Sequence, residues 1–168
     1  GRTQVVGVLI PQLDQPFFSA LTFSIEQALF SEDYRTLICS SEGNRKKEDA
    51  YIDMLMRQRV DGVIFAPMEQ SGTNIKQLLK REIPVVIVDR DLPEINGISR
   101  VLTDNFHGAY DGMRHLLDLG HRQIGIVSGP RYSQVMTQRI RGAYQAVIDF
   151  GLTPNEDFLI SGLLSPFE

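Results

Sequence analysis

The chain has 168 residues, of which 42% are hydrophobic and 23% are charged, and its formal net charge is −4. This composition is typical of a folded chain of one domain, or of one domain and part of another, and it argues against intrinsic disorder. The longest apolar runs, such as Val85–Val88, are of strand length and far below the roughly 18 to 20 residues that a membrane helix needs. The excess of acidic residues argues against direct nucleic-acid binding by this segment.

Motifs for chemistry are missing from the sequence. Cys39 is the single cysteine, and the three histidines lack metal-ligand spacing, so neither a disulfide scaffold nor a zinc site is predicted. No glycine-rich nucleotide loop, phosphate loop or nucleophile elbow is present, and no secretory signal precedes the first strand. We therefore expect a cytoplasmic protein that is not an enzyme, with no metal, no cofactor and no membrane partner. A mature exported protein would look the same.

Short apolar runs rich in β-branched residues alternate with longer amphipathic segments along the whole chain. This alternation predicts βαβ units and therefore an α/β fold with parallel sheets. The predicted strands cover 5–10, 35–40, 62–66, 84–88, 99–103, 123–128 and 157–161, and the predicted helices cover 17–31, 45–59, 73–81, 106–119 and 134–150.

The alternation breaks once, after the loop at 91–97, because strand 99–103 follows without a helix. Such a break indicates an edge or crossing strand that leads the chain towards a second sheet. We predict that residues 1–100 form one doubly wound lobe and that residues 101–168 begin a second lobe. The second lobe has about two strands and two helices, so it is expected to be incomplete.

Polar and aromatic side chains follow several predicted strands. In an open parallel sheet, ligands bind beyond the carboxyl ends of the strands. The candidate ligand-binding residues are Asp14, Gln15, Phe17 and Phe18 after the first strand, Asp89 and Arg90 after the fourth, and Arg139 in the last predicted helix. Aromatic rings cover the apolar faces of a sugar, whereas carboxylate and guanidinium groups bond to its hydroxyls. These residue types therefore favour a small ligand with many hydroxyl groups.

Each candidate also has a purely structural interpretation. One of the two phenylalanines is expected in the core, and Asp14 can equally cap the helix that follows. Arg90 could pair within the protein, and Arg139 could lie on a solvated helix face. Asp89 is the strongest candidate, because a carboxylate buried at a strand end must find a partner.

Several segments in a fixed order resemble the effector-binding domain of the lactose/galactose repressor (LacI/GalR) family of bacterial transcription regulators. The matching segments are Val5–Pro11, Gln15–Phe18, Arg59–Ile64, Ile83–Arg90, Asp104–Tyr110, His115–Gly125, Ser128–Pro130 and Arg139–Gly142. The resemblance spans essentially the whole chain. It implies a periplasmic-binding-protein-like fold, in which two doubly wound parallel-sheet lobes close on a small effector, and the second lobe is incomplete in this chain.

The resemblance also implies roles for individual residues. It places Gln15, Phe17 and Phe18 in the cleft, Asp89 and Arg90 on ligand hydroxyls, and Arg139 on the opposing lobe. Many relatives have asparagine where this chain has Gln15. The expected effector is a sugar or a sugar phosphate, and its binding would couple lobe orientation to operator affinity.

Partners follow from the same resemblance. Operator DNA would be bound by a helix-turn-helix domain outside this chain, and Gly1–Thr3 resembles the linker that follows that domain. A homodimer is expected, with the exposed part of helix 45–59 and the loop 68–72 as candidate contacts. The alternative function is a periplasmic sugar-binding protein of a transporter, which shares the fold but requires a signal peptide upstream.

Overall fold

The computed structural model describes residues 1–68, 71–131 and 133–162. The chain divides into two compact units, Gly1–Leu102 (unit 1) and Thr103–Glu168 (unit 2). None of the helices within the described ranges is long and apolar enough to cross a membrane.

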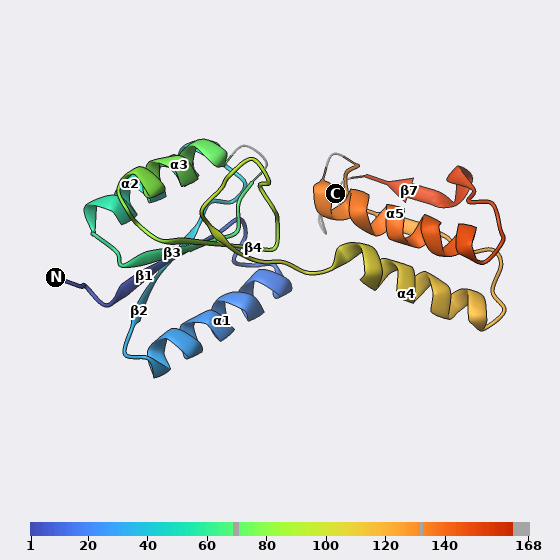
Figure 1. Cartoon of the computed structure of the whole chain (residues 1–168), viewed down its shortest axis with the longest axis horizontal. Coiled ribbons are helices and arrows are strands. Elements are labelled where there is room, and N and C mark those ends of the chain that lie inside the picture. Colours follow the sequence, from blue (N-terminus) through green and yellow to red (C-terminus); the bar gives the residue numbers. More distant parts are fainter. Residues whose placement is uncertain (69–70, 132, 163–168) are drawn as a thin grey trace. The chain divides into compact units, whose positions relative to one another are not determined.

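Unit 1 is built on a five-stranded sheet (Figure 1). Its strands are β1 (Val5–Ile10), β2 (Arg35–Ser40), β3 (Gly62–Phe65), β4 (Val85–Val88) and β5 (Ser99–Val101). Every neighbouring pair is parallel, and the order across the sheet is β2-β1-β3-β4-β5. The predicted α/β class and parallel sheet are therefore confirmed.

Helices cover both faces of this sheet, as the nearly continuous apolar strands require. The helices are α1 (Pro16–Ser31), α2 (Arg45–Arg57) and α3 (Gly72–Lys80). Figure 1 shows α1 on one face and α2 with α3 on the other. Successive residues of β1 point to opposite faces, so Val8 packs with Phe18 of α1 whereas Leu9 packs with Leu55 of α2.

A loop rather than a helix connects β4 to β5. Leu92 and Ile95 of this loop are buried in the core on the α2 and α3 side of the sheet, where they take the place of a helix. Arg100 of β5 anchors the loop by hydrogen bonds. Its Nε donates to Asp91 Oδ1 at 2.7 Å, and its terminal nitrogen donates to the carbonyls of Leu92 and Ile95. The strand predicted without a preceding helix is thus the edge strand of unit 1.

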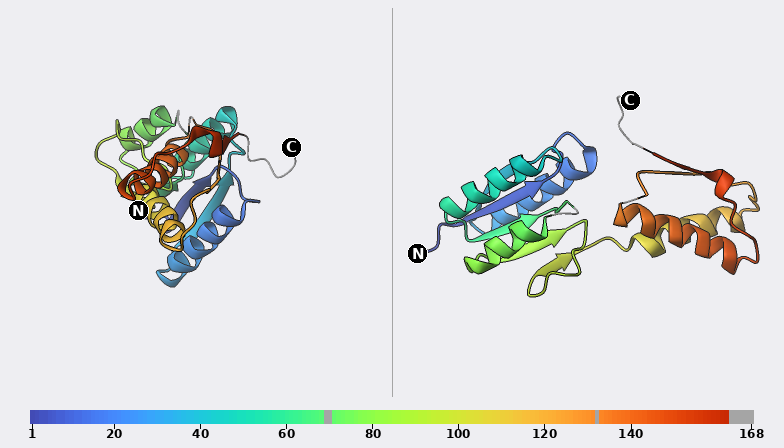
Figure 2. Two further views of the ribbon diagram at one scale, coloured as in Figure 1. Left: turned by 90° about the vertical axis from the view of Figure 1, so that its right-hand side faces the viewer. Right: turned by 90° about the horizontal axis from the view of Figure 1, so that it is seen from above.

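Unit 2 contains a two-stranded parallel sheet and two long helices. Its elements are α4 (Asn105–Asp118), β6 (Ile126–Ser128), α5 (Gln134–Asp149), the 3-10 turn η1 (Glu156–Phe158) and β7 (Leu159–Ser161). Figure 2 shows α4 and α5 side by side, and they share a small core of Met113, Leu117, Ala143 and Ala146. The predicted strand start at residue 123 is wrong, because pairing with the short β7 begins only at Ile126.

Candidate functional site

The carboxyl ends of the five parallel strands share one edge of unit 1. The strand order reverses at β1, which has β2 on one side and β3 on the other. Open α/β sheets bind ligands at such a reversal, because the loops after the two central strands leave towards opposite faces. The loop after β1 therefore lies at the favoured position, and Asp89 follows β4 two strands away. Adjacent strands are about 4.8 Å apart, so the two loops are separated by about 10 Å, which suits a small sugar.

The loop after β1 presents polar groups at the start of α1. Gln15, and not Asp14, occupies the N-cap position, and the Gln15 side chain makes no capping hydrogen bond. The capping role considered for Asp14 is therefore wrong, and its side chain is exposed. The Gln15 amide donates to the side-chain oxygen of Gln12, and the Leu13 N–H donates to Ser40 Oγ at 3.3 Å. These two bonds fix the loop and leave the Asp14 carboxylate facing solvent.

The two phenylalanines at the start of α1 divide into one core residue and one surface residue. Phe18 is 8% exposed and packs with Val8, Ile10 and Val88. Phe17 is 52% exposed and contacts Phe18 edge to face, with ring centroids 5.1 Å apart. Phe18 was predicted to line the cleft, but its ring belongs to the core, so Phe17 is the ring of this pair that a ligand can reach.

Asp89 and Arg90 follow β4 at the same edge. Asp89 adopts φ 69°, and its N–H donates to the carbonyl of Val101 at 3.2 Å, while the Arg90 N–H donates to the Val88 carbonyl at 2.8 Å. Both side chains are half-buried. The Nε of Arg90 is buried without a hydrogen-bond partner in the part of the chain that the structure describes. Arg100, which the sequence did not single out, provides the structural ion pair of this loop, so Arg90 is left available.

Unit 2 places another arginine at the beginning of its second helix. Arg139 Nε donates to Asn105 Oδ1 at 2.8 Å, which joins the second turn of α5 to the first turn of α4. Ser128, at the end of β6, is buried, and its Oγ has no partner among the described residues. Neither Asn105 nor Ser128 was predicted, because an asparagine and a serine next to helix and strand ends usually serve as caps.

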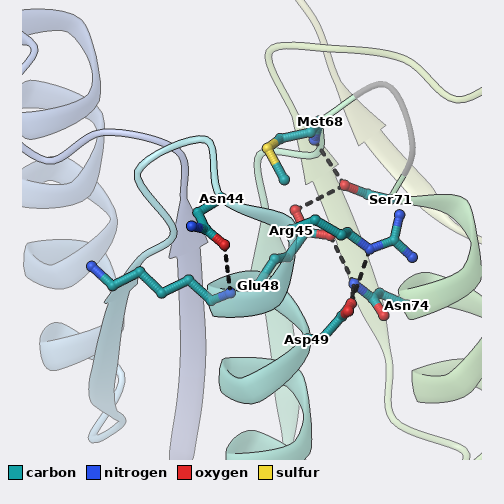
Figure 3. A network of polar contacts seen from close by, with 8 residues as sticks. Asn44, Arg45, Glu48, Asp49, Met68, Ser71 and Asn74 are labelled. Atoms are coloured by element: carbon teal, nitrogen blue, oxygen red, sulfur yellow. Dashed lines mark hydrogen bonds and ion pairs between the residues drawn. The ribbon is translucent and has the colours of Figure 1, made fainter.

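A buried carboxylate network joins α2 to Met68 and to the start of α3 (Figure 3). Glu48 of α2 is fully buried and accepts hydrogen bonds from Ser71 Oγ at 2.9 Å and from Asn74 Nδ2 at 2.8 Å. Ser71 Oγ in turn accepts the N–H of Met68 at 2.8 Å. This network was missed because Glu48 stands in the run Arg45–Asp49, which suggests a solvated helix face.

Burial and hydrogen bonding shift the two acids of this network in opposite directions. Burial raises the pKa of Glu48, and the bonds from Asn74 and Ser71 only partly offset that effect. The pKa of Asp49 is lowered, chiefly by the amide of Asn74 and also by Arg45, whose Nε lies 3.0 Å from Asp49 Oδ1. The network is therefore a structural clamp that holds α2 against the start of α3.

Two hollows of the surface lie away from the predicted residues. A cavity of about 260 Å³ in unit 2 lies at the carboxyl ends of α4 and α5, and one of about 520 Å³ in unit 1 lies at the amino edge of the sheet, next to Asp61 and Pro84. Across the described ranges, no group of three or more His, Cys, Asp or Glu residues could hold a metal ion. The candidate site is thus a set of polar loops at strand ends.

Comparison with known proteins identifies the family of this chain. Residues 3–163 match the family described as periplasmic binding proteins and sugar binding domain of the LacI family. The chain is 30% identical over 161 residues to the HTH-type transcriptional repressor PurR of Aliivibrio salmonicida, covering 95% of this chain and 48% of that protein. It is also 30% identical over 162 residues to the HTH-type transcriptional regulator DegA of Bacillus subtilis, with the same coverage of 95% and 48%. The chain spans about half the length of these curated relatives.

Solved structures show the same fold. The transcription regulator GntR of Chromobacterium violaceum matches with a TM-score of 0.81 and 25% identity over 96% of this chain and 58% of that one. The regulator CcpA of Lactococcus lactis matches with a TM-score of 0.83 and 24% identity over 98% of this chain and 60% of that one, a likeness of fold. This chain therefore belongs to the family of periplasmic binding proteins and LacI sugar-binding domains.

Proposed function

We propose that this chain is part of the effector-sensing region of a DNA-binding transcription regulator and that it binds a sugar or a sugar phosphate. The observation that carries the proposal is the pair Asp89 and Arg90 at the ligand-binding edge of the unit 1 sheet. There the Arg90 guanidinium has a buried Nε without a hydrogen-bond partner among the described residues, and it lies next to the half-buried carboxylate of Asp89. Buried polar groups without a partner are rare in folded proteins, and a bound ligand is one way of satisfying them.

The remaining residues of the edge suit the same class of ligand. Asp89 would accept hydrogen bonds from hydroxyls, and Arg90 would donate to hydroxyls or to a phosphate. The exposed ring of Phe17 would cover an apolar sugar face. Gln15 would contribute its amide, and Arg139 of unit 2 would supply a further pair of donors. Related regulators have been solved as a CelR–cellobiose complex and as a complex with D-xylulofuranose.

Regulation would follow from a two-state equilibrium of the intact protein. An effector shifts such an equilibrium only by its differential affinity for the two states, and operator affinity then changes by linkage. DNA binding would come from the helix-turn-helix that gives the relatives their names, since this segment has a net charge of −4. Those names favour a regulator, acting in the cytoplasm without catalysis, over a transporter's binding protein.

We also propose that the regulator is a homodimer, because a two-fold protein matches a two-fold operator. The contact surface expected at helix 45–59 is charged: seven of the thirteen residues of α2 are Arg, Lys, Asp or Glu. Of the predicted loop 68–72, residues 69–70 lie outside the described part. The better surface is the one formed by α1 and β2, where Phe23, Phe30 and Ile38 are 66%, 56% and 45% exposed.

Calorimetry of the full-length protein against a defined panel tests the proposal. The panel contains pentoses, hexoses, cellobiose and their phosphates, with nucleobases and amino acids as the other classes. We expect saturable binding of at least one sugar or sugar phosphate, and recovery of the ligand unchanged after incubation. Binding of a nucleobase with none of the sugars, or conversion of the sugar, would contradict the proposal.

A further inference from the structure

Arg139 is held at one end of its guanidinium by a buried asparagine. Arg139 Nε donates to Asn105 Oδ1 at 2.8 Å, and Asn105 Nδ2 donates to the carbonyl of Thr103 at 3.1 Å. Arginine can only donate and a carbonyl can only accept, so the Asn105 amide has a single possible orientation and both of its ends are used. Asn105 is 8% exposed, which shields these bonds from water.

Helix packing brings these two side chains together. A Cβ on Gly142 would lie 2.0 Å from the carbonyl oxygen of Phe106, so α5 can approach the first turn of α4 this closely only with glycine there. Arg139 lies three residues before Gly142 and therefore on the same face of α5. Asn105 directly precedes Phe106, so the contact between the backbones places Arg139 beside Asn105.

The contact leaves the other end of the guanidinium unused. Within the described ranges, the two terminal NH₂ groups of Arg139 have no hydrogen-bond or ion-pair partner, and the side chain is exposed. Arg131, by contrast, pairs with Glu156 at 2.8 Å. Because α4 precedes β6 and α5 follows it, both helices run against the strands, and their first turns lie at the carboxyl edge of this sheet. Arg139 thus offers two donors at the edge where such sheets bind ligands.

We propose that Asn105 is a positioning residue that orients Arg139 for the effector. The inference rests on the proposed function, in which Arg139 contacts that effector. Fixing Nε leaves a planar pair of NH₂ groups in one direction, the geometry that phosphate or two adjacent hydroxyls accept in a bidentate manner. Because this arginine is ordered before the ligand arrives, less side-chain freedom is lost on binding and the affinity is higher.

The first test reads the contact without any ligand. In the full-length protein labelled with ¹⁵N-arginine, we expect the Arg139 Nε–H resonance to be dispersed and to exchange slowly with water. Asn105→Ala keeps the bond from the residue 105 backbone N–H to the Thr103 carbonyl, 2.9 Å in length, so the turn survives. In that variant the resonance should move to the position of free arginines and exchange faster. A resonance that Asn105→Ala leaves unchanged would overturn the inference.

The second test is a double-mutant cycle on affinity, using whichever of cellobiose, D-xylulose and ribose 5-phosphate the wild type binds most tightly. We expect Arg139→Ala and Asn105→Ala each to raise the Kd about tenfold or more, and the double variant to be little worse than Arg139→Ala. Asn105→Asp should fall between wild type and Asn105→Ala, because a carboxylate can accept from Arg139 but cannot donate to Thr103.

Two matched controls separate positioning from general damage. Asp104→Ala removes the N-cap of α4, whose Oδ1 accepts the His107 N–H at 3.0 Å, but does not touch Arg139. Arg141→Ala removes an exposed positive charge two residues further along α5. Both should leave the Kd within about twofold of wild type, whereas an Asp104→Ala loss as large as that of Asn105→Ala would overturn the inference.

The outcomes distinguish this inference from the proposed function. A tenfold loss in Arg139→Ala with an unchanged Kd in Asn105→Ala would overturn the inference and leave the proposed function intact. An unchanged Kd in Arg139→Ala would overturn the inference together with the effector contact assigned to Arg139. If no sugar binds, the proposed ligand class is wrong. The change of the Arg139 Nε–H resonance in Asn105→Ala then still shows whether Asn105 orders the Arg139 side chain.

Discussion

Asp89 combines an unusual backbone conformation with the position that we assign to the effector. Its φ of 69° lies in the left-handed region, which aspartate, asparagine and glycine tolerate better than other residues. Asp89→Asn therefore removes the charge without adding strain, whereas Asp89→Ala would add about 1 kcal/mol of strain. We expect Asp89→Asn to weaken sugar binding by one to two powers of ten, since a hydrogen bond to a charged group contributes about 1.5–3 kcal/mol.

Affinity and melting temperature of Asp89→Asn are measured on one sample. The melting temperature should stay at the wild-type value, and so should the affinity of the control Glu32→Gln, an exposed carboxylate that follows α1 at its far end. A lowered melting temperature with an unchanged Kd would show that Asp89 is structural, and the effector assignment would then fail.

Unlike Asp89, Glu48 is a fully buried carboxylate to which we assign a role in stability and not in ligand binding. Glu48→Ala leaves the Ser71 hydroxyl without its acceptor in the core and leaves Asp49 as the acceptor of the Asn74 amide. An unsatisfied buried group costs about 1–3 kcal/mol. We expect the free energy of unfolding to fall by at least that amount in chemical denaturation. The control is Glu42→Ala, which breaks only the exposed pair with Lys47 at 2.7 Å and should leave stability unchanged. Equal stability of the two variants would refute the clamp.

The raised pKa of Glu48 predicts a pH dependence. Burial makes the folded state hold this proton more tightly than the unfolded state, whose pKa is near the ordinary 4.5. The stabilisation from Glu48 is therefore fully present below pH 4.5 and is lost as the pH rises through the folded pKa. Glu48→Gln is uncharged throughout, so its melting temperature minus that of wild type should increase from pH 4 to pH 8. A difference that is constant over this range would contradict the prediction.

At the scale of single residues, the sequence predicted where the candidate residues lie in the sheet better than it predicted what each side chain contacts. Asp14, Gln15, Asp89 and Arg90 do follow β1 and β4 at the carboxyl edge, because strand ends can be read from apolar runs. The exposure of Phe17 and the burial of Phe18 could not be assigned in advance, since adjacent helix residues differ by only 100° and the helix orientation was unknown. Glu48 and Asn105 were missed because their partners lie 23 to 34 residues away in the chain.

At the scale of elements, the approach of α4 and α5 depends on one glycine. Gly142→Ala would place a methyl group 2.0 Å from a backbone oxygen that cannot rotate away, so the helices must separate. We expect a loss of about 1–3 kcal/mol in the free energy of unfolding, the usual cost of overpacking. The matched control is Gly112→Ala on the exposed side of α4, where nothing lies within 4 Å of the new Cβ.

Gly112→Ala should increase stability by about 0.5–1 kcal/mol, because alanine is the better helix former. Denaturant titrations of the two variants should therefore shift in opposite directions. A Gly142→Ala protein as stable as Gly112→Ala would show that the helices do not approach as described.

Element boundaries show where periodicity is informative. The helices and the strands of unit 1 lie within about two residues of their predicted ranges, because each has a buried apolar face of its own period. The link between β4 and β5 was read correctly as having no helix, but the anchoring of its loop by Arg100 was not foreseen. An arginine that donates to backbone carbonyls produces no periodic pattern of apolar residues. Because every residue has a backbone carbonyl, the sequence does not show which carbonyls will accept these bonds.

At the scale of the whole molecule, the surface of α1 is unusual for a helix on the outside of a sheet. Glu26 is the only charged residue among its sixteen, and Phe23 and Phe30, seven residues apart, are exposed on one side. Ile38 of β2 pairs in register with Val8, which packs under α1, so Ile38 faces the same side of the sheet. Contiguous exposed apolar residues of this kind mark protein contact surfaces.

We therefore predict that the full-length regulator sediments as a dimer at micromolar concentration and that α1 and β2 form its contact in unit 1. Phe23→Asp would bury a charge in that contact, which is costly without a partner, so this variant should sediment as a monomer with an unchanged circular dichroism spectrum. Ala50→Asp, on the exposed and charged side of α2, tests the surface expected from sequence and should remain a dimer. A dimer in Phe23→Asp with a monomer in Ala50→Asp would move the interface to α2, and a monomeric wild type would refute dimerisation itself.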